Sequence, residues 1–314
     1  MAVSGGMRVV IAGGSGFIGT RLCRILVDAG HTPFILTRSA GRAAGSLLPG
    51  VSAIGWDGRT GQGWAQFLDQ DTALVNLAGE NIAAGRWTPE RKQRILESRV
   101  FSGQAMADAV ARAQFRPRVL VQASAVGFYG PRGPEPLDES APSGTGFLAE
   151  VCRAWEASSR AVEQAGVRRC VIRTGVVLGP GGALARMLPA FRFFLGGPLG
   201  SGEQFLSWIH LDDEVQAIRF LLENQGCSGA YNCCAPNPAD SRTFARTLGL
   251  VLGRPALLPA PAPALRLLLG EMAQEVLLSG QNVRPARLME EGYRFLHPDL
   301  EGALRAALHL PEAA

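Results

Sequence analysis

Three glycines near the start of the chain have the spacing of a turn that can hold a pyrophosphate. They lie in the segment Gly13-Gly14-Ser15-Gly16-Phe17-Ile18-Gly19, directly after the apolar run Met7 to Ala12. In such a turn Gly13 permits the bend, Gly16 lets the backbone approach the pyrophosphate, and Gly19 lets a helix pack on the preceding strand. Backbone amides at the start of that helix then bind the negative charge. The segment predicts a dinucleotide site, with a purely structural glycine turn as the alternative.

An arginine ends the next apolar run, at a position that distinguishes NAD(H) sites from NADP(H) sites. Sites for NAD(H) commonly place an acidic residue there to bind the ribose hydroxyls, whereas sites for the 2′-phosphate place an arginine. Here the run ends with Thr37-Arg38-Ser39, and Arg42 follows without an intervening acidic residue. The forked guanidinium of Arg38 can bind a phosphate, and Thr37 or Ser39 can add a hydroxyl. We therefore expect NADP(H), with an exposed surface arginine as the alternative.

The elements that must position these residues alternate along the chain. After the first apolar run, Phe17 to Ala29 carries apolar residues at helical spacing until Gly30. Further apolar runs that we expect to be strands are Pro33 to Leu36, Val51 to Ile54, Ala73 to Leu77, Val119 to Gln122 and Cys170 to Ile172. Two long helical patterns are Glu90 to Ala113 and Ala149 to Gln164. This alternation predicts an α/β fold with a doubly wound parallel sheet of Rossmann type.

The pattern becomes irregular after about Gly179. Glycine-rich and proline-rich segments separate the helices there, in Gly196 to Gly202, Cys234 to Pro238 and Pro255 to Pro263. We expect residues 7–179 to form the NADP(H)-binding domain, to which later segments can add a strand. Residues 180–310 then form a smaller, mainly helical C-terminal lobe that folds over the carboxyl edge of the sheet and binds the substrate.

Three motifs close the later predicted strands. Asn76-Leu77-Ala78-Gly79 ends the fourth strand, Ser124 follows the fifth within Gln122 to Gly130, and Arg173 to Gly181 follows the sixth. Together with the glycine turn, and in the same order and spacing, they resemble the extended short-chain dehydrogenase/reductase superfamily.

A second set of motifs narrows the resemblance. They look like those of the atypical subfamily of sugar-nucleotide epimerase-like proteins, an epimerase family, and the match runs from Met7 to about Leu308. The nucleotide sugar in that label is an analogy, because a fold does not fix the substrate. The motifs are Gly79-Glu80-Asn81-Ile82, Arg86-Trp87-Thr88, Glu97-Ser98-Arg99-Val100, Gly196 to Gly202, Trp208-Ile209-His210 and Gly280 to Pro285.

The resemblance implies which residues hold the adenosine side of the cofactor. Arg38 would hold the adenosine phosphate, and Asp57 would lie by the adenine. Because Asp57 stands in a turn, a local cap of that turn is the alternative. The residues implied to contact the pyrophosphate are Ser15, Gly16, Phe17 and Ile18.

Other residues would line the nicotinamide side. The resemblance implies that Leu77-Ala78-Gly79 lines the cofactor through its backbone and that Val177 lies near the nicotinamide. Arg99 would face the cofactor from the helical segment Glu90 to Ala113, with a surface ion pair as the alternative.

The usual proton donor of the superfamily is absent. Its reaction uses a tyrosine four residues before a lysine, in which the phenol exchanges a proton with the substrate oxygen and the ammonium lowers the phenol's pKa. The corresponding positions here are Phe147 and Val151. None of the three tyrosines of the chain has a lysine four residues on, since Lys92 is the only lysine. We therefore do not expect hydride transfer by the usual route, although the cofactor site is retained.

Three side chains are candidates for the missing catalytic role. Ser124 could hold a carbonyl oxygen, and Tyr129, five residues later, could be an acid or could pack beside the site. Glu80 follows the fourth strand, and burial beside the nicotinamide could raise its pKa and make it a general acid, with a cap or an ion pair as the alternative. A catalytic His210 is a weaker alternative, because a single histidine usually has its hydrogen bonds satisfied.

Two functions fit these residues. The first is an NADP(H)-dependent oxidoreductase or epimerase that acts on an unknown small molecule. The second is a catalytically silent protein that responds to NADP(H) occupancy and recruits a partner. They differ in whether the nicotinamide is ever oxidised.

Composition excludes several other classes. The net charge of +4 is spread thinly, without basic runs among aromatic residues, so we expect no nucleic-acid partner. The six cysteines show no metal-ligand spacing, so we expect reduced thiols and no metal. We expect no signal peptide before the first strand, and no apolar stretch attains the ~18 to 20 residues of a membrane span. We therefore expect a cytoplasmic location and no membrane partner.

The two long helical patterns bear on the oligomeric state. Extended relatives often pair through helices that correspond to Glu90 to Ala113 and Ala149 to Gln164. A homodimer is one outcome, and packing of the same apolar faces at the edge of a monomer's core is the other.

Overall fold

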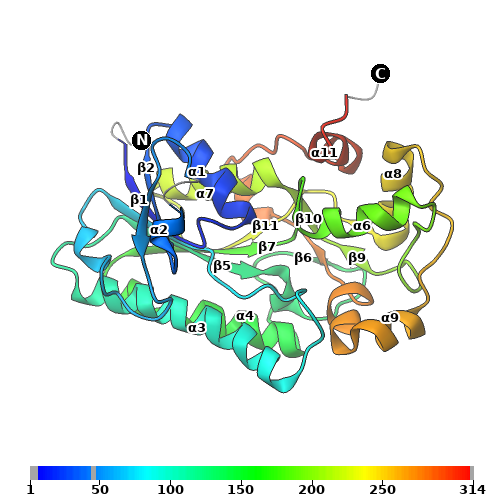
Figure 1. Ribbon diagram of the computed structural model, residues 1–314, viewed down its shortest axis with the longest axis horizontal. Coiled ribbons are helices and arrows are strands. Elements are labelled where there is room, and N and C mark those ends of the chain that lie inside the picture. Colours follow the sequence, from blue (N-terminus) through cyan, green and yellow to red (C-terminus); the bar gives the residue numbers. More distant parts are fainter. Residues whose placement is uncertain (1–5, 44–46, 312–314) are drawn as a thin grey trace.

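A sheet of seven parallel strands forms the centre of the computed structural model (Figure 1), in the order β11-β7-β5-β4-β1-β2-β3. The structure describes residues 6–43 and 47–311, with residues 42 and 43 by backbone alone. The strands are β1 (Arg8–Ala12), β2 (Thr32–Thr37), β3 (Ser52–Gly55), β4 (Thr72–Asn76), β5 (Val119–Ala125), β7 (Arg168–Thr174) and β11 (Gly229–Cys233). The predicted doubly wound parallel sheet is confirmed.

The strand order reverses at β1, which pairs with β2 on one side and β4 on the other. Ala12, its last residue, lies opposite Leu36 and Asn76. In sheets of this kind ligands bind outside the carboxyl ends of the strands at such a switch point. The glycine turn follows Ala12 directly and therefore lies there.

Helices cover both faces of the sheet (Figure 1). Successive side chains of β1 point to opposite faces of the sheet. Val9 and Ile11 pack in one hydrophobic cluster, and Val10 and Ala12 pack in another. The first layer contains α1 (Phe17–Asp28) and α7 (Leu211–Glu223), and the second contains α3 (Pro89–Arg112), α4 (Phe147–Ser158) and α5 (Ala161–Gln164).

The helix expected from Ala149 to Gln164 is interrupted at Ser159. The Arg169 guanidinium donates to the Glu156 carbonyl oxygen over 3.1 Å, so this oxygen is engaged where a continuous helix would use it for the Arg160 amide. That amide bonds the carbonyl oxygen of Ala157 instead, at 3.1 Å. A contact from β7 thus ends α4 one turn before α5.

The C-terminal lobe begins at the carboxyl edge of the sheet. β8 (Val176–Leu178) follows β7 after Gly175 and pairs with β10 (Trp208–His210). The lobe has its own core, which includes Trp208, Phe244 and Leu304. Its other elements are α6 (Gly182–Arg192), β9 (Phe205–Leu206), β12 (Ala239–Asp240), α8 (Ser241–Leu252), α9 (Ala262–Leu269), the π-helical turn η4 (Ala273–Leu277), β13 (Asn282–Val283), α10 (Ala286–Glu290) and α11 (Leu300–Ala307).

Two segments beyond residue 180 belong to the central sheet and its cover. β11 extends the sheet beside β7. α7 is joined to α1 by an ion pair between Arg21 and Asp212, at 2.6 Å. Among the described residues no helix is both long and apolar enough to cross a bilayer. The short elements of the first domain are α2 (Ala40–Ala43), η2 (Ala65–Phe67), η3 (Val126–Tyr129) and β6 (Pro136–Leu137).

Candidate cofactor-binding site

At two positions of the turn after β1 a Cβ would clash with backbone atoms. Gly13 has a φ of 79°, and a Cβ there would lie 2.8 Å from the carbonyl carbon of Leu77. A Cβ on Gly19 would lie 2.3 Å from the carbonyl oxygen of Gly13. On Gly16 a Cβ would meet only that same oxygen, at 3.2 Å. The outer side of Gly16 is therefore open to a ligand.

The start of α1 offers amide donors that no side chain caps. Gly16 is the N-cap, and the first turn contains no acidic residue. Ser15 and Gly16 are exposed. The first amides of an α-helix lack partners within the helix and carry the positive end of its dipole. An anion can bind here, where Ser15 to Ile18 are expected to contact the pyrophosphate.

Phe17 joins this turn to the C-terminal lobe. Its ring lies against the turn after β8, where a Cβ on Gly179, Gly181 or Gly182 would lie 2.8 to 3.2 Å from ring atoms. The Val177 carbonyl oxygen is 3.8 Å from the Cβ position of Gly182. The structure thus brings Val177, expected near the nicotinamide, next to the first turn of α1.

Arg38 directly follows β2, on the same edge of the sheet as the glycine turn. Its side chain is exposed and forms no hydrogen bond or ion pair with another described residue. The hydroxyl of Thr37 accepts a hydrogen bond from the Ser39 amide at 3.3 Å. The side chain of Arg42 lies outside the described residues. No described carboxylate competes with a phosphate for Arg38.

Arg99 lies against the segment after β4. A Cβ on Gly79 would be 3.0 Å from Cζ of Arg99, and Nη1 of Arg99 donates to the Glu80 carbonyl oxygen at 3.1 Å. The guanidinium also stacks on the Trp155 ring, 4.8 Å from its centroid, and burial lowers the pKa of Arg99. Arg99 thus faces Leu77-Ala78-Gly79 and forms no ion pair with a described carboxylate.

Asp57 caps the turn in which it stands. Its Oδ1 accepts hydrogen bonds from the amides of Arg59 and Thr60, each at 2.8 Å, and Oδ2 accepts from the Thr60 hydroxyl at 2.9 Å. These are the contacts of a local cap, which was the alternative role for Asp57. The contact of Asp57 with the adenine stays a prediction.

Ser124 takes part in a buried ion-pair network. It lies within β5 instead of after it, and its hydroxyl donates to Glu156 Oε1 at 2.8 Å. Arg173, within β7, donates to both carboxylate oxygens of Glu156, at 2.9 and 3.1 Å. The side chains of Arg173 and Glu156 are only 7 % and 14 % exposed. Such forked pairs fix both partners, so Ser124 is held by a charged acceptor.

Tyr129 belongs to the same network. Its hydroxyl donates to Asn232 Oδ1 at 2.7 Å and accepts from Arg173 Nη1 at 3.0 Å. The side chain is fully buried, and burial raises the pKa of Tyr129 to about 12, although Arg173 opposes the shift. A catalytic acid works best with a pKa near the operating pH. These contacts fit the packing role for Tyr129.

Glu156 and Asn232 bond Ser124 and Tyr129, and the sequence patterns did not single them out. Glu156 lies one helical turn after the buried Cys152, so helical spacing could have placed it on the face of α4 that meets β5. Asn232 comes from β11, and no local pattern links it to Tyr129, which is 103 residues earlier.

Glu80 forms ion pairs at the start of α3. Its Oε1 lies 3.3 Å from Arg91 Nη1 and 3.6 Å from Arg94 Nε. The Glu80 amide donates to the Ser98 hydroxyl at 3.0 Å. The structure thus shows the ion pair that was the alternative to acid catalysis.

Phe147 begins α4 at the position where the superfamily has its tyrosine. The Trp87 ring lies 5.0 Å from the Phe147 ring, centroid to centroid, and Lys92 Nζ lies 4.5 Å from the Phe147 centroid. Nζ also pairs with Glu271 at 2.8 Å. Glu275, from η4, accepts the Leu148 amide at 3.2 Å. Lys92, the only lysine of the chain, does not lie four residues after a tyrosine in the sequence. It nevertheless reaches the start of α4 from α3.

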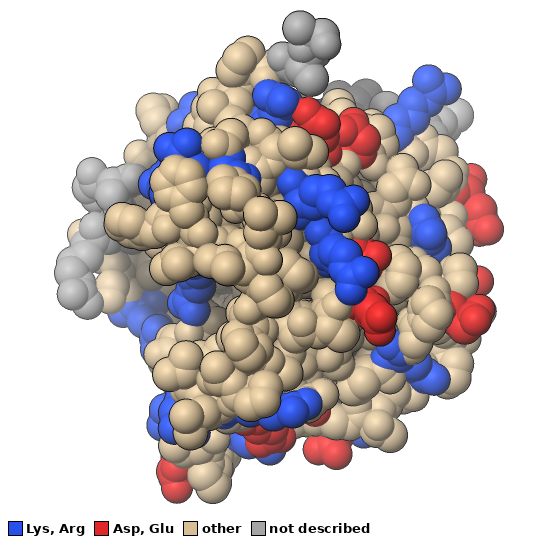
Figure 2. Space-filling model, turned by 90° about the vertical axis from the view of Figure 1, so that its right-hand side faces the viewer, with Lys and Arg blue, Asp and Glu red and all other residues tan. Residues whose placement is uncertain are grey.

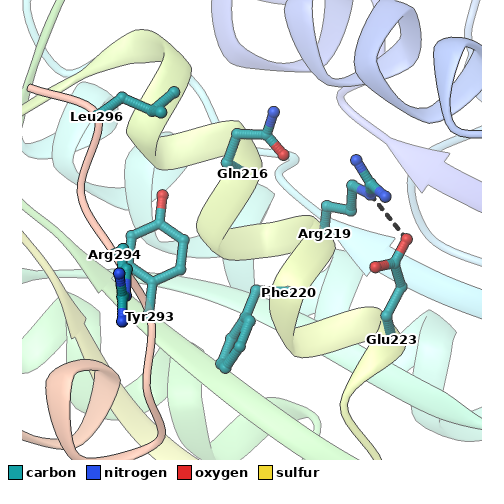
Figure 3. A pocket seen from close by; sticks show the side chains of 7 residues that line it. All are labelled: Gln216, Arg219, Phe220, Glu223, Tyr293, Arg294 and Leu296. Atoms are coloured by element: carbon teal, nitrogen blue, oxygen red, sulfur yellow. Dashed lines mark hydrogen bonds and ion pairs between the residues drawn. The ribbon is translucent and has the colours of Figure 1, made fainter. Parts of the chain in front are cut away.

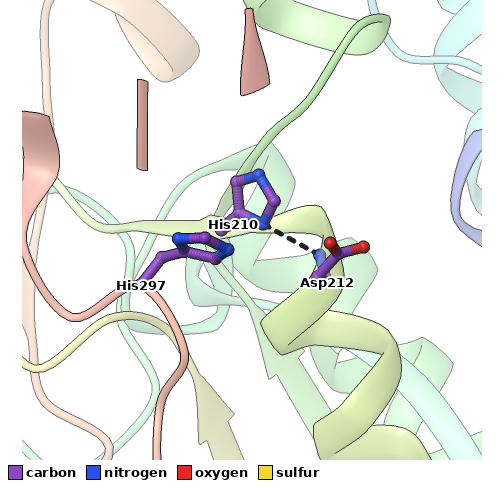
Figure 4. A group of neighbouring side chains, drawn as sticks. All are labelled: His210, Asp212 and His297. Atoms are coloured by element: carbon purple, nitrogen blue, oxygen red, sulfur yellow. Dashed lines mark hydrogen bonds between the residues drawn. The ribbon is translucent and has the colours of Figure 1, made fainter. Parts of the chain in front are cut away.

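Three potential metal ligands meet where β10 leads into α7 (Figure 4). The ligand atoms of His210, Asp212 and His297 lie within 4.8 Å of one another. Nδ1 of His210 accepts the Asp212 amide at 3.1 Å, which leaves the proton of the neutral ring on Nε2. Asp212 is paired with Arg21. Burial and the neighbouring His297 ring lower the pKa of His210 to about 4. The cluster is therefore best explained as the N-cap of α7.

A cavity of about 230 Å³ lies outside this site (Figure 3). One side of α7 and the residues Tyr293, Arg294 and Leu296 line it, and the ion pair between Arg219 and Glu223 crosses one wall. None of its lining residues is expected to bind the cofactor.

Comparison with family models supports the fold and the motifs. Residues 9–234 match the NAD dependent epimerase/dehydratase family, and residues 260–307 match a domain of unknown function. The second segment contains Glu271 and Glu275, which lie near the start of α4.

Individual relatives match along nearly the whole chain. The epimerase family protein SDR39U1 homolog, chloroplastic, of Arabidopsis thaliana is 44% identical over 96% of this chain and 87% of its own length. The epimerase family protein YfhF of Bacillus subtilis is 38% identical over 95% and 97%. The crystal structure of human epimerase family protein SDR39U1 with NADPH has a TM-score of 0.86 at 36% identity, over 96% of this chain and 99% of that one. The chain therefore belongs to the NAD dependent epimerase/dehydratase family, among the atypical short-chain dehydrogenase/reductase members called epimerase family proteins.

Proposed function

We propose that the protein binds NADP(H) at the switch point of its sheet. The observation that carries the proposal is Arg38, exposed and without a described partner on the same edge as the uncapped start of α1. The 2′-phosphate would bind at Arg38 and the pyrophosphate at the helix start. The human relative solved with NADPH supports this choice. The proposed binding residues are Gly13, Ser15, Gly16, Phe17, Ile18, Gly19, Thr37, Arg38, Asp57, Leu77, Ala78, Gly79, Arg99 and Val177.

The function that the geometry supports best is cofactor binding without proton transfer by the superfamily's tyrosine and lysine. Ser124 and Tyr129 are held in the network of Glu156 and Arg173, and Glu80 is ion-paired. Phe147 cannot exchange a proton. A protein of this kind would respond to the fraction of its cofactor sites that NADPH occupies. It would pass this state on to a partner.

A second candidate is an oxidoreductase or epimerase that uses a different proton donor. The observation that favours it is the ammonium of Lys92, 4.5 Å from the Phe147 ring and paired with Glu271. Bound NADPH would supply a hydride, and the Lys92 ammonium would supply the proton to a carbonyl oxygen of a small polar substrate.

Location and assembly are parts of the same proposal. We place the protein in the cytoplasm, although one relative is named as chloroplastic, and we propose a homodimer through the outer faces of α3 and α4. Fractionation and light scattering of the full chain test these two statements.

Purified full-length protein tests the binding and the output separately. We expect it to bind NADPH at least about tenfold more tightly than NADH in a fluorescence titration. We expect no oxidation of the bound NADPH when a library of carbonyl compounds and nucleotide sugars is added. Equal affinity for the two cofactors contradicts the binding proposal. NADPH oxidation with any library member favours the second candidate.

A further inference from the structure

An exposed apolar surface covers the outer side of the C-terminal lobe, away from the glycine turn. Figure 2 shows this side of the molecule, where most of the surface is neither acidic nor basic. Eight large apolar side chains here are each between 53 and 81 % exposed. They are Phe193, Phe194, Leu195, Leu250, Leu257, Leu258, Leu267 and Leu268.

Backbone contacts join the segments that carry these side chains. The Leu258 amide donates to the Gly196 carbonyl oxygen at 3.3 Å, and Leu199 forms a bridge with Ala260. The Arg254 guanidinium lies 4.8 Å from the centre of the Phe194 ring. The loop after α6 and the loop after α8 therefore form one continuous surface, which α9 extends.

α9 is an apolar helix without a buried residue. Its sequence is APALRLLL, and none of its eight residues is buried. A helix that is apolar on most of its circumference is normally covered by protein or by lipid. The described chain does not supply that cover.

Phe194 holds a backbone conformation that favours glycine. Its φ is 62°, just after the end of α6, where the Leu195 amide bonds the Ala190 carbonyl oxygen at 2.8 Å. This position of a helix end is usually glycine, and a bulky residue there is strained. The strained turn presents the rings of Phe193 and Phe194 to solvent, and strain of this kind commonly marks a functional site.

Basic residues outnumber acidic ones around the apolar side chains, although Glu203, Asp240 and Glu271 adjoin the segments that carry them. Residues 182–202 and 241–270 contain six arginines, all exposed, and no aspartate or glutamate. These six exceed the net charge of +4 of the whole chain. None of them pairs with a carboxylate among the described residues. They are Arg186, Arg192, Arg242, Arg246, Arg254 and Arg266. Arg186 donates to the Ala83 carbonyl oxygen, on the cofactor side of α6, so only the other five belong to the outer surface.

We propose that this surface, made of the eight apolar side chains and the five arginines other than Arg186, docks on an anionic lipid bilayer. A bilayer offers an apolar interior for the phenylalanines and leucines beside phosphate groups for the arginines. A second copy of the chain is disfavoured, because a symmetric contact would bring the arginines of both copies together with fewer acidic residues to oppose them. This proposal departs from the expectation of no membrane partner, which rested on the lack of a spanning segment and did not consider a surface contact. With eight residues, α9 is about 12 Å long and would lie on the bilayer, not cross it.

Co-sedimentation of the full chain with vesicles tests the proposal. Vesicles of phosphatidylcholine alone are compared with vesicles of phosphatidylcholine and phosphatidylglycerol in equal parts, at low and high salt. We expect at least about tenfold tighter binding to the anionic vesicles, weakened by salt. The double variant Leu267→Ser, Leu268→Ser and the double variant Arg246→Gln, Arg254→Gln should each lose about tenfold or more of this binding.

Matched changes elsewhere serve as controls. Phe115→Ser and Arg112→Gln alter exposed residues outside the surface and should bind vesicles like the wild type. All variants should keep the wild-type melting temperature and NADPH affinity, which separates this test from that of cofactor binding. Equal binding to both vesicle types, or none, overturns the proposal. Variant-sensitive self-association, or binding to polyglutamate without vesicle binding, overturns it in favour of a second copy or an acidic protein.

Discussion

The Ser124 hydroxyl donates a hydrogen bond to Glu156 Oε1 at 2.8 Å, so the serine that the superfamily turns toward substrate is here bound to a carboxylate. The same oxygen accepts from Arg173 at 2.9 Å. A hydroxyl bound to an ionised acceptor is less available to a substrate carbonyl than a free one. This hydrogen bond gives Ser124 a structural role at the edge of the sheet. Substitutions can measure how much it contributes to stability.

Replacing Glu156 should destabilise the protein strongly. Glu156→Ala leaves the guanidinium of Arg173, which is 7 % exposed, without its counter-charge. We expect the free energy of unfolding in urea to fall by about 3 to 5 kcal/mol. Ser124→Ala removes one hydrogen bond and should lower it by only about 1 kcal/mol. Similar losses for both variants would argue against the ion pair as the centre of the network.

Tyr129→Phe should change stability and leave cofactor binding unchanged. The substitution removes the hydroxyl that bonds Asn232 and Arg173, which should lower the free energy of unfolding by about 1 to 2 kcal/mol. Urea denaturation measures the loss, and NADPH titration measures the affinity. A large drop in NADPH affinity at unchanged stability would instead place the phenol at the cofactor.

Glu214 should make stability fall as pH rises. Its side chain is fully buried, Oε1 accepts from the Thr174 hydroxyl, and Oε2 has no partner. Burial raises the pKa of Glu214 from 4.5 to about 8. Between these values the folded protein keeps a proton that the unfolded chain has lost, so its stabilising effect is complete at low pH and disappears as the pH passes about 8.

Glu214→Gln should remove this dependence, because an amide does not titrate in this range. Denaturation at about pH 5 and about pH 9 should show a decrease on the order of a few kcal/mol in the wild type and a smaller one in the variant. The exposed Glu290→Gln serves as the control and should behave like the wild type. If the stability of Glu214→Gln decreases as much as that of the wild type, another titrating group causes the decrease.

Lys92 separates the two candidate functions. If a substrate that oxidises NADPH is found, Lys92→Met should lower its rate by about a hundredfold or more, since positioned proton donors contribute that much. Lys92→Arg keeps the pairing charge with Glu271 and controls for stability. Unchanged turnover in Lys92→Met would remove Lys92 from the catalytic site.

Local patterns predict the sheet and the cofactor edge because each depends on residues close in sequence. The glycine turn, Arg38 and the strand runs are of this kind, and β1, β2 and β4 lie where expected. The network around Ser124 is different, because Tyr129 and Asn232 meet only when β5, β7 and β11 pair. The approach of Lys92 to Phe147 likewise depends on how α3 packs beside α4.

Cofactor discrimination by Arg38 tests the central claim most directly. Titration calorimetry of the wild type, Arg38→Ala and the exposed control Arg24→Ala with NADPH and NADH gives six affinities. We expect Arg38→Ala to lose between about tenfold and about a hundredfold in NADPH affinity with NADH affinity unchanged, and Arg24→Ala to match the wild type. An Arg38→Ala protein that still prefers NADPH as strongly as the wild type would contradict the assignment of this site.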